Sequence, residues 1–105
     1  LGNGLNPVVF TDNSSTPNEY KISAAYPNPF NPVVSFDVDL SNETFISASV
    51  FNLSGQKVAE IYEGKLNEGL NTLSWNAIGF ASGIYFINIE SDNTLLSSQK
   101  ISLLK

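Results

Sequence analysis

From Tyr20 onward the chain alternates apolar and polar residues in short runs, which are separated by turn-forming residues. The stretch 34–40 is the clearest run, because every second residue is Val, Phe or Leu and the residues between are Ser or Asp. A period of two predicts a strand with one buried face, on which Asp37 and Asp39 point to solvent. The stretch 46–50 predicts a second strand in the same way. No stretch has the period of an amphipathic helix, so the pattern predicts an all-β fold.

Turn signals divide the middle of the chain into further strands. Gly55 follows a polar run and predicts a hairpin turn, because glycine adopts a positive φ without a steric penalty. A strand is expected to resume at 57–62, and the glycine-containing segment 63–69 is expected to be a turn. Leu73 and Trp75 then share one face of the next strand, which makes Trp75 a candidate for the core.

Residues 84–89, IYFINI, are apolar on both faces apart from Asn88, which predicts a central strand that is covered on each side. Within it, Tyr85 is expected to be a core aromatic residue with its hydroxyl at the rim. Gly83 precedes this strand, and an apolar run within 95–105 follows it. These strands and their frequent turns predict an immunoglobulin-like antiparallel β-sandwich of about seven strands.

The beginning of the chain differs in composition from the rest. It is rich in Asn, Gly, Ser, Thr and Pro, so we predict that residues 1–19 are a linker from an upstream part of the protein and that residues 20–105 are one folded domain. The apolar run Val8–Phe10 is compatible with an unpacked linker, a short strand docked on the domain, or the end of a preceding domain. Because the sequence begins at Leu1 and has no Met, we expect a piece of a longer precursor whose signal peptide has been removed.

The composition argues against most catalytic chemistry. The 105 residues include no Cys and no His, and all five basic residues are Lys. The chain therefore lacks a thiol nucleophile, an imidazole base and soft metal ligands, and we expect no enzyme activity, cofactor or bound metal. The net charge of −5 disfavours nucleic acid as a partner. No apolar run reaches the about 20 residues of a membrane-spanning helix, so we expect a soluble monomer.

Two groups of carboxylates are candidates for catalysis or metal binding, because an enzyme without His or Cys would need a pair of carboxylates in its active site. Asp37 and Asp39 share a strand face, but the pattern is that of the solvent side of a sheet. Residues 90–93 sit at a predicted turn and lack the about six to eight oxygens that calcium prefers. Both groups are predicted to be solvated surface. The Asn-x-Ser/Thr triplets, which are expected to be turns rather than glycan sites, begin at Asn13, Asn42 and Asn52.

The segment 26–32, YPNPFNP, contains three prolines, each of which fixes φ and keeps the preceding residue out of the helical region. Since proline cannot donate to a β-ladder, this stiff segment must lie at a sheet edge or before the first strand, with Tyr26 and Phe30 packed inward. Two roles are open, a rigid lead-in to the sandwich and a recognition strip. The candidate recognition residues are Pro27, Asn28, Pro29, Phe30 and Pro32.

The last apolar strand is bracketed by Lys100 and Lys105. Charges at the ends of an edge strand prevent promiscuous pairing, which is a structural role. A partner protein could also bind an end strand by strand addition, so a recognition role is equally open. The candidate recognition residues here are Lys100, Ile101, Leu103, Leu104 and Lys105. The residues expected to act through folding alone are Gly55, Trp75, Gly83 and Tyr85.

Five segments, taken in order, resemble the C-terminal sorting domains of the type IX secretion system. They are YPNPFNP at 26–32, VFNLSGQKV at 50–58, GLNTLSW at 69–75, SGIYFINI at 82–89 and KISLLK at 100–105. Each motif alone recurs in other β-domains, and their order and spacing make the resemblance specific. The middle segments also resemble the immunoglobulin-like domain of flagellar hook-capping proteins, which supports the fold more than the function.

The resemblance implies a domain that serves as an address and has no chemistry of its own. It would direct a secreted cargo through the periplasm and the outer membrane of a Gram-negative, Bacteroidetes-like bacterium to the medium or the cell surface. The implied partners are the type IX translocon, an outer-membrane shuttle β-barrel and a surface sortase. In that family the sortase commonly removes the domain, here expected upstream of Tyr20, and can join the cargo to an anionic lipopolysaccharide.

The alternative function is a non-catalytic accessory module of a secreted enzyme, either carbohydrate-binding or a spacer. Carbohydrate-binding modules usually carry a line of exposed aromatic residues on one face. The single tryptophan, Trp75, is expected in the core instead, so the sequence favours the sorting function.

Overall fold

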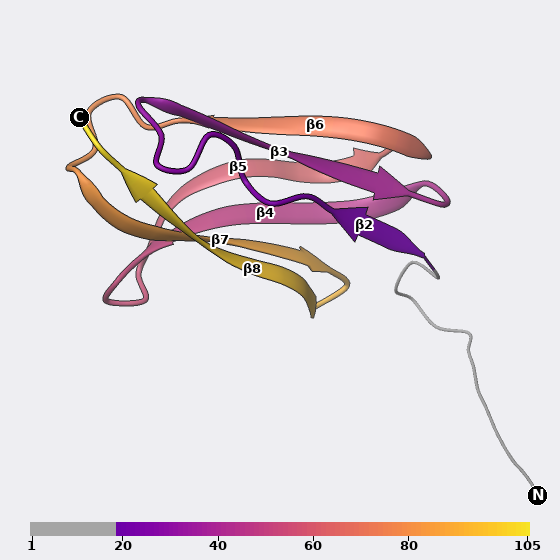
Figure 1. The fold of residues 1–105 in the computed structure, drawn as a ribbon. Coiled ribbons are helices and arrows are strands. Elements are labelled where there is room, and N and C mark those ends of the chain that lie inside the picture. Colours follow the sequence, from indigo (N-terminus) through magenta and orange to yellow (C-terminus); the bar gives the residue numbers. More distant parts are fainter. Residues whose placement is uncertain (1–18) are drawn as a thin grey trace, which may run out of the picture.

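The computed structural model describes residues 19–105, which form two antiparallel β-sheets that pack into a sandwich (Figure 1). The three-stranded sheet has the order β2 (Tyr20–Ile22), β3 (Val33–Leu40), β6 (Gly69–Asn76). The four-stranded sheet has the order β5 (Lys57–Leu66), β4 (Thr44–Asn52), β7 (Gly83–Ser91), β8 (Thr94–Leu103). The predicted all-β sandwich of about seven strands is confirmed. Within this range no helix is long and apolar enough to span a membrane.

The chain enters the fold at β2, where Tyr20 pairs with Leu40. The predictions for the linker, for the apolar run Val8–Phe10 and for the triplet at Asn13 lie outside the described residues. Asn42 lies in the connection before β4, and the Asn52 side chain accepts two backbone hydrogen bonds in the turn that follows β4. Asn42 is therefore a turn residue, as predicted, whereas Asn52 is the last residue of β4 and its side chain binds the turn that follows.

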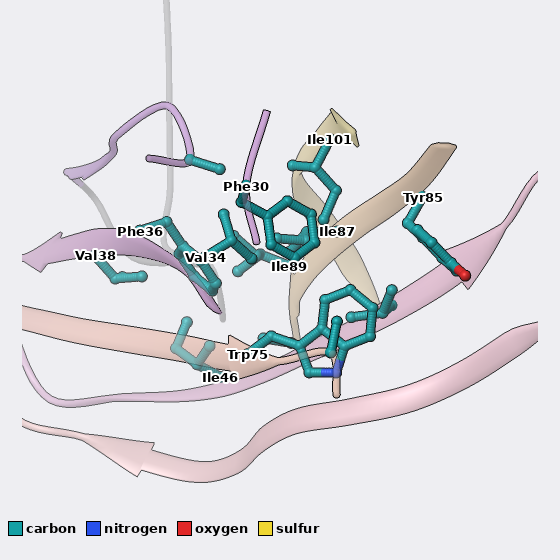
Figure 2. Packing of buried hydrophobic residues seen from close by; sticks show 14 of the residues in the cluster. Phe30, Val34, Phe36, Val38, Ile46, Trp75, Tyr85, Ile87, Ile89 and Ile101 are labelled. Atoms are coloured by element: carbon teal, nitrogen blue, oxygen red, sulfur yellow. The ribbon is translucent and has the colours of Figure 1, made fainter. Parts of the chain in front are cut away.

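The core lies between the sheets and follows the alternation in the sequence. Val34, Phe36 and Val38 of β3 have no solvent exposure, while the residues between them are exposed or partly exposed. The facing residues of the other sheet are Ile46, Ala48, Val50, Ile87, Ile89 and Ile101 (Figure 2). Burying a side chain as large as valine, isoleucine or phenylalanine stabilises the fold by about 1.5–3 kcal/mol. These positions are therefore the main source of stability.

An aromatic cluster closes one end of the core. Trp75 packs against Phe30, Phe80 and Tyr85, with ring centroids 5.9, 5.1 and 5.5 Å apart. Tilted and edge-on rings at these separations are the favourable arrangement for aromatic pairs. Tyr85 is buried and its hydroxyl donates to the Ala81 carbonyl at 2.7 Å, as expected for a core aromatic residue with its hydroxyl at the rim.

The predicted turn at 63–69 is wrong in its first part, because β5 continues to Leu66. Gly64 lies inside this strand, and a Cβ there would come 3.4 Å from the Tyr62 hydroxyl. That hydroxyl reaches past the glycine and donates to the Lys65 carbonyl at 2.7 Å. The glycine thus marks a place where an aromatic side chain lies over the strand, not a chain reversal.

The burial of the two faces of β7 also differs from the prediction. β7 is an inner strand between β4 and β8, but Ile84 and Phe86 on its outer face are only partly buried, whereas Ile87 on its inner face is buried. Among residues 19–105 no further layer covers the outer face, since the two sheets share a single core. The prediction of cover on both sides is therefore wrong for the described chain. A two-layer sandwich leaves the outer face of each sheet open.

Candidate functional site

The proline-rich segment 26–32 lies along the edge of β8. The Phe30 amide donates to the Ser102 carbonyl at 2.9 Å, and the Leu104 amide donates to the Phe30 carbonyl at 3.0 Å. Phe30 thereby forms an isolated parallel bridge with Leu103. This is possible because Phe30 keeps the amide hydrogen that a proline lacks.

The Asn28 side chain extends this pairing. Its Nδ2 donates to the Lys100 carbonyl at 3.1 Å, and its Oδ1 accepts from the Ser102 amide at 3.0 Å. Pro27 and Pro29 have no amide hydrogen, so the backbone on either side of Asn28 cannot donate to a ladder. The side-chain amide supplies one donor and one acceptor in place of the backbone.

Gln99 secures the chain just before the prolines. Its Oε1 accepts from the Ala25 amide at 2.8 Å, and its Nε2 donates to the Ser23 carbonyl at 2.7 Å. Residues 23–30 therefore follow the edge of β8 from Gln99 to Leu104. We call this hydrogen-bonded boundary the seam. It satisfies the backbone groups of an edge strand that would otherwise invite pairing with other chains.

The same segment also contacts the other sheet. Tyr26 and Ser35 of β3 exchange two backbone hydrogen bonds, at 2.8 and 2.9 Å, and the Ala77 amide donates to the Pro32 carbonyl at 2.9 Å. The proline-rich segment thus connects β3 of one sheet to β8 of the other, although no strand belongs to both sheets.

Phe30 and Tyr26 behave differently, although both were predicted to pack inward. Phe30 is 2% exposed and belongs to the core, but Tyr26 is 45% exposed, so its predicted role as an inward anchor is wrong. Tyr26 pairs with Ser35, and directly opposed residues point to the same face of a sheet. The Tyr26 side chain accordingly points outward, and its hydroxyl donates to Asp37 Oδ1 at 2.9 Å. This hydrogen bond is the main cause that raises the pKa of Tyr26.

The two groups of predicted recognition residues meet at the seam, but only some of them are accessible. At the C-terminal group, Ile101 and Leu103 are buried, whereas Leu104 is 57% exposed and both flanking lysines are exposed. In the proline-rich group, Phe30 is buried. The exposed members are Pro27, Asn28, Pro29, Lys100, Leu104 and Lys105, and Pro32 is partly exposed.

Comparison with known proteins bears on the role of this seam. The family model described as the secretion system C-terminal sorting domain, of the type IX system, matches residues 24–103. The chain belongs to this family. The match runs from Ala24 to Leu103, so it includes the proline-rich segment and all of the seam except Ser23 and Leu104. No curated protein sequence matches the chain.

Membership of the family establishes the general function. The sorting domain is a C-terminal signal for type IX secretion, and it interacts with that secretion machinery. Its cargo is a secreted or cell-surface protein of Bacteroidetes-type bacteria.

The predicted folding residues of the sorting domain occupy special positions. Gly55 has a φ of 84° in the turn between β4 and β5, and Gly83 has a φ of 153° at the start of β7. Trp75 and Tyr85 both lie in the aromatic cluster. An alanine at Gly55 would be strained even though an added Cβ meets nothing within 4 Å, because L-residues rarely adopt this φ.

The acidic residues of the sorting domain are mostly surface groups, with one correction. Asp39 is exposed as predicted, but Asp37 is partly buried and Asp37 Oδ1 accepts hydrogen bonds from Tyr26 and from Thr72, the latter at 2.7 Å. On β5, a side-chain hydrogen bond with Glu60 raises the pKa of Glu63. Within residues 19–105 no group of three or more acidic side chains could hold a metal ion.

Sequence reasoning missed Gln99 as part of the seam. The sequence does contain an indication of this role, because Gln99 alternates with the buried residues Ile101 and Leu103 and therefore points to the same face of the strand. A polar residue in an apolar series indicates a side chain with a specific hydrogen-bonding partner.

Proposed function

We propose that the export machinery recognises the sorting domain in its folded state, at the exposed surface of the seam. The single observation that carries this proposal is the Asn28 side chain, which bonds to both Lys100 and Ser102. It joins the proline-rich group and the C-terminal group, which are separated by about seventy residues, into one surface. Both roles considered for the prolines then apply together, because the rigid lead-in also forms part of the recognition surface.

The occupied edge of β8 favours recognition of a folded surface over strand addition. The groups on the open side of β8 from the Lys100 carbonyl to the Leu104 amide are hydrogen-bonded to Asn28 and Phe30. A partner strand could pair there only after displacing the proline-rich segment. Displacement would also remove Phe30, which is 2% exposed, from the aromatic cluster.

The placement of the chain ends supports the same function. Tyr20 pairs with Leu40 at one end of the sandwich, whereas the Lys105 amide donates to Ser82 Oγ at the opposite end (Figure 1). A cargo joined upstream of Tyr20 therefore leaves the fold far from Leu104 and Lys105. This arrangement keeps the surface of the seam accessible to a partner while the cargo is attached.

The finer steps of export follow from the family resemblance. The domain boundary lies at Tyr20, and the domain has no catalytic activity. The translocon and an outer-membrane shuttle β-barrel bind the domain, and a surface sortase cleaves the chain upstream of Tyr20. The pairing of Tyr20 with Leu40 supports this cleavage position, because a protease needs an extended chain that is not held in a sheet.

A carbohydrate-binding or spacer function has less support. Trp75 is 6% exposed. The most exposed aromatic residues are divided between the two sheets, because Tyr20 and Tyr26 pair with β3 and Phe45 lies on β4. Retention of the chain on an insoluble polysaccharide would favour that function instead.

The proposed site can be tested by export of a reporter fused upstream of the whole chain, in a host with a type IX system. The double variant Leu104→Ser with Lys105→Ala changes the exposed end of the seam. Leu70→Ser with Lys65→Ala is the matched control, since Leu70 is 69% exposed and both residues lie away from the seam. We expect the first variant to remain in the periplasm and the control to be exported. Equal export of both would contradict the site.

The cleavage step has its own readout. N-terminal sequencing of the fragment that stays associated with the domain, or mass spectrometry of the released reporter, locates the cut. The proposal expects a cut before Tyr20. A cut within residues 20–105 would contradict it.

A further inference from the structure

The outer face of the four-stranded sheet carries a row of side chains that the core does not use. Phe51 of β4 pairs with Phe86 of β7, and these two are flanked by Lys57 of β5 and Lys100 of β8. Since strands are about 4.8 Å apart, the row of four residues is about 14 Å wide. Ile84 lies two residues from Phe86 on the same face of β7.

These aromatic side chains face away from the core. Phe51 follows the buried Val50, and Phe86 precedes the buried Ile87, so strand alternation directs both rings outward. Neither ring is among the partly buried residues that pack against the core. Within residues 19–105 no further layer of secondary structure lies over this row, and both rings are partly exposed. Partly exposed apolar side chains that lie together on an open sheet face are typical of an interaction surface.

The charge on this face changes along the strands. Lys57 is held by Glu60 at 3.2 Å, whereas Lys100 forms no ion pair within the described residues. Glu63 and Glu90 flank Ser47 on the same face, and Glu90 is four residues, about 13 Å, along β7 from the row. Beside the aromatic row, the unneutralised positive charge therefore lies on β8. Toward the other end of the face, the two carboxylates Glu63 and Glu90 outnumber one lysine, Lys65.

We propose that Phe51, Ile84, Phe86 and Lys100 dock a protein of the export machinery that presents apolar side chains with a carboxylate opposite Lys100. This inference rests on the proposed function and extends its site, because the Lys100 carbonyl is already bonded to Asn28 of the seam. The surface thus runs without interruption from the proline-rich segment over β8 to the two phenylalanines.

The charge pattern and the size of the surface favour this partner over two others. A flat anionic membrane that covered the sheet would also face Glu60, Glu63 and Glu90 and would be repelled by them. A row about 14 Å long and one or two side chains deep covers an area on the order of 150 Å², far less than the about 800 Å² per partner of a stable dimer, so a second copy would gain too little contact from this row alone. A partner of the machinery can make up this area by contacting the seam as well.

The test uses export of a reporter fused to the whole chain in a host with a type IX system. Phe51→Thr with Phe86→Thr removes both rings while keeping good strand formers. Phe45→Thr is the matched control, because Phe45 is 44% exposed on the same sheet face but pairs with Lys65 at the other end. We expect export to fall about tenfold for the double variant and to stay within about twofold for the control. Melting temperatures of the purified chains show whether the fold is kept.

A second pair of variants tests the charge. Lys100→Glu is expected to lower export, and Lys65→Glu, which changes the net charge equally, is expected to leave it unchanged. If the unaltered chain is not exported, the proposed function itself fails. If the unaltered chain is exported and the row variants are exported equally well, or if the controls are impaired to the same degree, only the docking surface is refuted.

The aromatic row could instead bind a second copy, a membrane or another segment of the chain, and each of these gives a distinct result that would overturn the inference. Size-exclusion chromatography showing a dimer that Phe51→Thr with Phe86→Thr abolishes would assign the face to a second copy. Binding to phosphatidylglycerol vesicles that Lys100→Glu abolishes would assign it to a membrane. Phe51→Thr with Phe86→Thr can also be made in a chain whose Val8, Val9 and Phe10 are changed to serine. If the ring substitutions lower stability in the unaltered chain but not in this one, the face binds that segment of the chain instead. A monomer without vesicle binding or such coupling supports the protein partner.

Discussion

The Asn28 side chain allows a direct perturbation of the seam. Asn28→Ala removes the partners of the Lys100 carbonyl and of the Ser102 amide. Each hydrogen bond of this kind contributes about 0.5–1.5 kcal/mol net, so two contribute about 1–3 kcal/mol. Asn28 is exposed and water can replace part of the loss, so we expect the free energy of unfolding to fall by about 1–2 kcal/mol.

Urea unfolding of the purified chain measures this change as a lower midpoint with an unchanged slope. The fluorescence of the single tryptophan, Trp75, is a suitable probe because its ring centroid lies 5.9 Å from that of Phe30. Asn31→Ala is the matched control, since Asn31 also precedes a proline, is exposed, and forms no side-chain hydrogen bond within residues 19–105. Equal destabilisation by both substitutions, or none by Asn28→Ala, would refute the reasoning.

Three further predictions concern stability. Gly55→Ala is expected to cost about 1–2 kcal/mol of unfolding free energy through its positive φ, and Gly55→Asn less, as measured by urea midpoints; equal costs would contradict the backbone explanation. Ser91→Ala is expected to raise the unfolding free energy by up to about 1 kcal/mol, because Ser91 is 1% exposed and its hydroxyl has no partner in the described chain; a lower melting temperature would argue against this. The hydrogen bond to Asp37 raises the pKa of Tyr26, so this pair stabilises the fold below the unfolded pKa of about 10 and stops doing so as the pH rises through the folded pKa. Tyr26→Phe should therefore remove part of the alkaline loss of stability in urea midpoints measured across that range, and an unchanged pH profile would contradict this.

Much of the fold could be predicted because the alternation of residues reports directly on burial. Val34, Phe36 and Val38 are buried where the period of two places them. The pattern is less informative where a strand carries a glycine for packing, so Gly64 was taken as part of a turn. It also cannot distinguish a face covered by the same domain from a face that is left open, as Phe86 demonstrates.

Most residues of the candidate site could be predicted from the sequence, but the contacts between them could not. The prolines and lysines stand out in the sequence, yet the contact between Asn28 and Ser102 spans 74 positions and depends on how the two sheets close. Tyr26 was misplaced for a similar reason. Its direction is set by pairing with Ser35, and this pairing is a tertiary contact that no local pattern indicates.

This domain carries the signal for export by the type IX system. The most direct measurement is the fraction of a reporter, fused upstream of the whole chain, that is found in the medium or on the cell surface of a type IX host and of the same strain without its translocon. The account predicts an extracellular or surface-bound reporter in the first strain and a periplasmic reporter in the second. A reporter that stays in the periplasm of both strains, or leaves both equally, would contradict it.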